Sequence, residues 1–105
     1  MDNLPEFKLK SPEEIKDFMS ENRMVISDLV LNAIKKALRE GALNMPVMKI
    51  IIQDLPVAIV TVDRNNFNDS LNKCLKIFEE DEQYEKCAEI LKIIKNDLYL
   101  DFSIK

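Results

Sequence analysis

The sequence predicts an α+β fold in one domain spanning residues 1–105: two N-terminal helices, a central antiparallel β-hairpin and a C-terminal antiparallel helical hairpin. Three observations lead to this fold. A chain of 105 residues supports one modest hydrophobic core. Apolar residues recur at helical spacing on both sides of the middle of the chain. The middle, VMKIIIQDLPVAIVTV, is rich in β-branched residues and is interrupted by Gln-Asp-Leu-Pro.

The first helix is expected over residues 12–20. Ser11 and Glu14 match the S-x-x-E capping box, and Pro12 occupies the first helical position, where its missing N–H costs nothing. The apolar residues at positions i, i+3 and i+4 of this helix are Ile15, Phe18 and Met19.

The second helix is expected between Ser27, a candidate N-cap, and Gly41, which suits the left-handed residue that ends a helix. Its last turns carry Lys35, Lys36 and Arg39. Cations stabilise the negative end of the helix dipole, and we prefer this interpretation to an anion-binding patch.

Two strands are expected at about 47–53 and 57–62, and their near-continuous apolarity predicts that both faces of the hairpin are partly covered. The terminal segments EFKLK and LYLDFSIK alternate apolar and polar residues, so both are candidate edge strands. The competing interpretation of the C-terminal segment is a short linear motif that docks on a partner.

A further helix is expected from Phe67 to Phe78, with Asp63 or Asn65 as its cap. The last helix has a predicted inner stripe of Tyr84, Cys87, Ala88, Leu91 and Ile94. The predicted core consists of Phe18, Val30, Ile34, Leu38, Ile50, Ile52, Ile59, Val60, Phe67, Leu71, Leu75, Phe78, Ala88, Leu91 and Ile94.

Five of the seven residues from 79 to 85 are acidic, and they fall where one helix ends and the next begins. The surrounding segment, FEEDEQYEKCAEILKII, resembles the UVR-type helical hairpin of bacterial excision-repair subunits and some kinase-activator proteins. The resembling positions are the aromatic-Glu step Tyr84 and Glu85, the small pair Cys87 and Ala88, and the aliphatic residues Ile90 and Ile94. Leu91 and Lys92 depart from the Arg-Asp of that motif. The resemblance covers a quarter of the chain and implies hairpin geometry and, secondarily, pairing with another protein.

Composition argues against several functions. With 15 basic and 19 acidic residues the formal net charge is −4, which opposes nucleic-acid binding. No apolar run has the ~20 residues that cross a bilayer, and the N-terminus lacks the pattern of a signal peptide, so a cytoplasmic location and no membrane partner are expected. The chain has no histidine and one glycine, so we expect no catalytic site, no cofactor and no metal. Cys74 and Cys87 are interpreted as small buried hydrophobic residues.

The sequence therefore predicts a small non-catalytic accessory protein that binds a protein partner or itself, and a homo-oligomer is expected. Its acidic, lysine- and isoleucine-rich character is typical of small accessory proteins of AT-rich bacteria or their phages. The predicted partner-binding residues are Ile90, Ile93, Tyr99 and Phe102, because Ile90 and Ile93 widen the last helix's apolar stripe beyond one neighbour. The alternatives are an acidic decoy of a nucleic-acid-binding protein and a small enzyme of unknown reaction.

Overall fold

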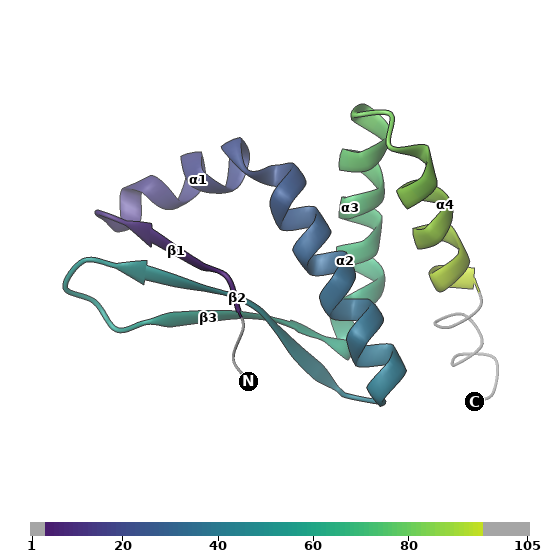
Figure 1. Ribbon diagram of the computed structural model, residues 1–105, viewed down its shortest axis with the longest axis horizontal. Helices are drawn as coiled ribbons and strands as arrows, with labels where there is room; N and C mark the ends of the chain where they lie inside the picture. Colours follow the sequence, from purple (N-terminus) through teal and green to yellow (C-terminus); the bar gives the residue numbers. More distant parts are fainter. Residues whose placement is uncertain (1–3, 96–105) are drawn as a thin grey trace.

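The computed structural model describes residues 4–95 and confirms the α+β fold (Figure 1). Its elements, in chain order, are β1 (Glu6–Leu9), the 3-10 helix η1 (Pro12–Glu14), α1 (Ile15–Glu21), α2 (Arg23–Glu40), β2 (Asn44–Ile52), β3 (Ala58–Asp63), the 3-10 helix η2 (Arg64–Asn66), α3 (Phe67–Glu80) and α4 (Tyr84–Ile93).

The described strands form a three-stranded sheet in the order β1-β2-β3. β2 and β3 are the predicted antiparallel hairpin, with Lys49 opposite Ile59, and an irregularity lies between Pro46 and Met48. The N-terminal edge strand is also confirmed, since β1 runs parallel to β2. The predicted C-terminal strand, 98–105, lies outside the described residues.

The helices build the core against one another and against the sheet. α2 crosses β2, α3 packs beside α2, and α4 turns back along α3 as the second arm of the predicted helical hairpin (Figure 1). The largest fully buried side chains come from all these elements and are Phe67, Phe78, Ile34, Met48, Leu71 and Ile90.

The helix boundaries agree with the chemistry of some predicted caps and not of others. Gly41 ends α2 in the left-handed region, with φ 70°, as predicted. Ser27 does not cap α2, because the helix begins at Arg23 and Ser27 is buried within it. The predicted capping box is not formed: the Glu14 carboxylate accepts from the backbone N–H of Lys10, the residue before the N-cap, at 3.0 Å, and the side chain of Ser11 caps nothing. No side-chain cap is present at α3 either, whose N-cap residue is Asn66.

The expectation that both faces of the hairpin are covered is wrong. Ile50 and Ile52 are buried, whereas Ile59, predicted to be in the core, is 54% exposed. Side chains alternate along a strand, so Ile59 and its partner Lys49 share the face opposite that of Ile50. That face of the β2–β3 hairpin stays open to solvent.

The predicted face of α4 is right at Cys87 and Ile94, which are buried and partly buried, and wrong at its other positions. Ala88 and Leu91 are exposed, whereas Cys87, Ile90 and Ile93 are buried. The helix has apolar residues on nearly every side, so its sequence pattern permits either rotation. Two ion pairs to α2 accompany the observed rotation: Lys86 with Asp28 and Glu89 with Lys35.

Candidate functional site

The structure describes two of the four predicted partner-binding residues. Ile90 has no exposed surface and Ile93 is 8% exposed, so both belong to the core and neither is available on the folded surface. Tyr99 and Phe102 lie outside the described residues. The large apolar residues that α4 exposes are instead Tyr84 and Leu91.

The largest group of exposed apolar side chains along the described chain lies in the turn after β2 and in the first residues of β3. Leu55, Val57 and Ile59 are each about half exposed. Leu55 lies in the connecting turn, where Asp54 adopts a positive φ of 65°. These three residues form a patch that we call the hairpin patch.

The backbone of β3 is free along its outer edge within the described sheet. Lys49 of β2 donates its N–H to the Pro5 carbonyl oxygen at 2.9 Å, so its backbone groups point toward β1. The next residue, Ile50, therefore points its backbone groups toward β3, where its partner is Ala58. Alternation along β3 then turns the N–H and C=O of Ile59 outward, away from β2.

The outer edge of β3 is uncharged over most of its length. Residues 57–62 read VAIVTV, between Asp54 and Asp63. Sheet edges that remain unpaired in native proteins are commonly protected by charged side chains, proline or bulges. The outward-facing positions of β3 are Ile59, Thr61 and Asp63, all exposed, and only Asp63, the last residue of the strand, carries a charge. β3 therefore has the chemistry of a strand that accepts another strand.

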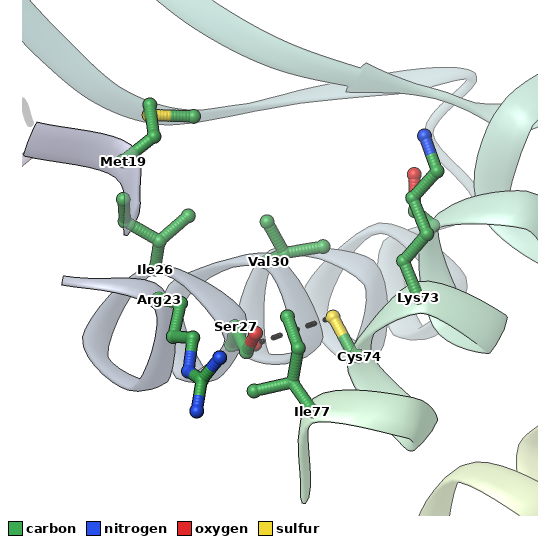
Figure 2. A pocket seen from close by; sticks show the side chains of 9 residues that line it. Met19, Arg23, Ile26, Ser27, Val30, Lys73, Cys74 and Ile77 are labelled. Atoms are coloured by element: carbon green, nitrogen blue, oxygen red, sulfur yellow. Dashed lines mark hydrogen bonds between the residues drawn. The ribbon is translucent and has the colours of Figure 1, made fainter. Parts of the chain in front are cut away.

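A cavity of about 240 Å³ lies in the groove between α3 and the α1–α2 corner (Figure 2). Its apolar wall consists of Met19, Ile26, Val30 and Ile77. The side chains of α2 that pair with α4, Asp28 and Lys35, lie on the opposite side of α2, so α4 leaves this groove uncovered.

The polar groups of the cavity are cationic or neutral. Arg23 and Lys73 point in opposite directions in Figure 2, and Arg23 forms a solvent-exposed ion pair with Glu80 at 3.8 Å. Ser70 lies one turn before Lys73 on α3, so these two side chains form a second polar end. No carboxylate lines the cavity.

Cys74 lines the cavity, and Cys87 packs between α3 and α4. Both thiols are free and buried, as predicted. Cys74 Sγ donates to the Ser27 carbonyl oxygen at 3.7 Å, and Cys87 Sγ donates to the Leu75 carbonyl oxygen at 3.9 Å. Burial raises the pKa of both thiols, and the Glu79 carboxylate raises that of Cys87 further.

We expect both thiols to resist a charged aromatic disulfide reagent in the native protein, because the thiolate is the reactive form and here it is disfavoured. Labelling should become complete within seconds in concentrated guanidinium chloride. Mass spectrometry of the modified peptides identifies which cysteine has reacted. Rapid labelling of either cysteine without denaturant would show that the packing around that cysteine is wrong.

The acidic corner is a tight, exposed turn. Glu82 adopts a left-handed φ of 57°, and the Gln83 N–H donates to the Phe78 carbonyl oxygen at 2.8 Å. Glu85 lies in the first turn of α4, where a carboxylate favours the positive end of the helix dipole. The corner is thus accounted for by the geometry of the helical hairpin.

Comparisons with protein-family models, curated proteins and solved structures found no match to this chain. The UVR resemblance therefore stays a prediction, and what the structure shows is the helical hairpin of α3 and α4. Among residues 4–95, no helix has the length and apolarity to span a membrane, and no three potential metal-ligating side chains cluster.

Sequence reasoning missed both the hairpin patch and the cavity. The uncharged run 57–62 was a usable signal for the patch, because a strand with one open face and no charge is a potential pairing edge. The cavity had no sequence signal, since it depends on how α2 and α3 diverge.

Proposed function

We propose that this protein is a non-catalytic interaction module that associates with a second copy of itself through the outer edge of β3. The single observation that carries the proposal is the outer edge of β3, which is uncharged from Ala58 to Val62 and lies next to the exposed hairpin patch. Strand addition supplies backbone hydrogen bonds for affinity, and adjacent side chains supply specificity.

The charges of β3 favour a second copy in the antiparallel direction. A two-fold axis near Val60 would set Ile59 of each copy opposite Thr61 of the other. Asp63 would then meet Val57 and not its own counterpart, so no carboxylates face one another. The pairing would join two three-stranded sheets into one and would bring the two hairpin patches together.

The experiment is light scattering across protein concentrations, from low micromolar to near millimolar. The wild-type mass should rise from one chain to two, and Ile59→Lys should remain at one chain, because a lysine protects a strand edge and the two copies would place like charges diagonally on the same face. Val25→Lys is the matched control, since Val25 is similarly exposed, at 50%, but lies on α2.

Circular dichroism should show the same helix content in all three proteins. If the wild-type mass stays that of one chain at every concentration, or if Val25→Lys and Ile59→Lys impair association equally, the proposed interface is wrong.

A further inference from the structure

We infer that the cavity between α3 and the α1–α2 corner is a binding site for a small aliphatic carboxylate of about six to eight carbons. This inference is independent of the proposed self-association, because none of the residues lining the cavity belongs to β3.

The size and wall of the cavity define the body of the ligand. An engineered apolar cavity of about 150 Å³ holds benzene, so about 240 Å³ holds a somewhat larger apolar group. The described apolar residues of the wall are aliphatic and none is aromatic: Met19 is unbranched and flexible, and the others, Ile26, Val30 and Ile77, are β-branched. An aliphatic chain fits this wall, and it gains free energy from the apolar surface it buries.

The charges around the cavity define the head of the ligand. Both ionised side chains that line it are cations, Arg23 and Lys73. Arg23 already faces Glu80, whereas Lys73 and Ser70 are three residues apart on α3, line the cavity together and supply two kinds of hydrogen-bond donor. A carboxylate can accept hydrogen bonds from an ammonium and a hydroxyl at once. A negatively charged head group on the ligand therefore complements Lys73 and Ser70, whereas a positively charged head group is repelled by Lys73.

The test is a titration of the ¹⁵N-labelled protein with sodium octanoate, monitored by NMR. Octanoate should produce saturable shifts in the amides of Val30, Lys73 and Cys74, and octylamine hydrochloride should not produce them. Lys73→Glu should weaken octanoate binding about fivefold or more, because an attraction becomes a repulsion. The matched control is Lys76→Glu on the same helix, which should change the affinity by less than about twofold, since Lys76 does not line the cavity.

A second variant, Val30→Phe, fills the cavity without changing any charge, and it should abolish the shifts. Because Lys73 is exposed, Lys73→Glu keeps the test decisive even if Val30→Phe fails to fold. The inference is overturned if octanoate gives no saturable shifts at these amides, if octylamine binds equally well, or if Lys73→Glu and Lys76→Glu bind octanoate with the same affinity as the wild type.

Discussion

Ile90→Asp should lower the free energy of unfolding by at least about 4 kcal/mol, or prevent folding altogether. Removing the buried Ile90 side chain forfeits apolar contacts worth about 2–5 kcal/mol, and the new carboxylate would be buried without a partner. Native domains are stable by only about 5–15 kcal/mol, so this loss is a large fraction of the total. Urea denaturation followed by circular dichroism measures it.

The control is the neighbouring substitution Leu91→Asp. Leu91 is 53% exposed, so its replacement should change the free energy of unfolding by no more than about 0.5 kcal/mol. The pair of variants therefore reports which side of α4 faces the core. A tolerated Ile90→Asp beside a destabilising Leu91→Asp would restore the rotation that the sequence pattern predicted.

Phe78→Ala should cost about 3–5 kcal/mol, because Phe78 is fully buried where α3 meets α4. The Lys86 ammonium lies 5.2 Å from the Phe78 ring centroid and also pairs with Asp28 of α2, so the ring contacts a side chain that links two helices. Truncating the ring leaves a cavity at the base of the helical hairpin. Chemical denaturation again provides the measurement.

Tyr84→Ala serves as the matched aromatic control, since Tyr84 is 65% exposed at the start of α4. It should change the free energy of unfolding by about 0.5 kcal/mol or less. Equal losses in Phe78→Ala and Tyr84→Ala would mean that the packing of α3 on α4 differs from the structure.

Local chemistry made much of the fold predictable. The single glycine, Gly41, marked the end of α2 because a left-handed residue carries little cost without a Cβ. The spacing of Phe67, Leu71 and Phe78 identified the buried face of α3 because few apolar residues compete elsewhere on that helix. The β-branched run and its Gln-Asp-Leu-Pro turn located the hairpin, and EFKLK located β1.

The errors arose where the sequence pattern allowed more than one buried face, or where burial depended on contacts between elements that are distant in sequence. In α4, Ile90, Leu91, Ile93 and Ile94 permit more than one inner face, and the partners of Lys86 and Glu89 on α2 are remote in sequence. The apolarity of β3 was interpreted as burial on both faces, but the described helices pack against one face only.

The candidate site was therefore less predictable than the fold. Ile90 and Ile93 were chosen because they extended an apolar stripe, yet such an extension indicates a partner only if the rotation of the helix is known. Ile59 was assigned to the core because the near-continuous apolarity of its strand predicted cover on both faces, and the open face of that strand is a property of the assembled sheet.

Hydrogen exchange at single amides, measured by NMR at several protein concentrations, tests the β3 interface most directly. The N–H groups of Ile59 and Thr61 point to the outer edge of β3, and pairing with a second copy would place them in hydrogen bonds. Lys8 is the internal control, because its N–H points to the outer edge of β1, on the far side of the sheet. We expect exchange at Ile59 and Thr61 to slow as the concentration rises, while exchange at Lys8 stays constant. Exchange at Ile59 and Thr61 that is independent of concentration, whether fast or already fully protected in the most dilute sample, would contradict self-association through β3.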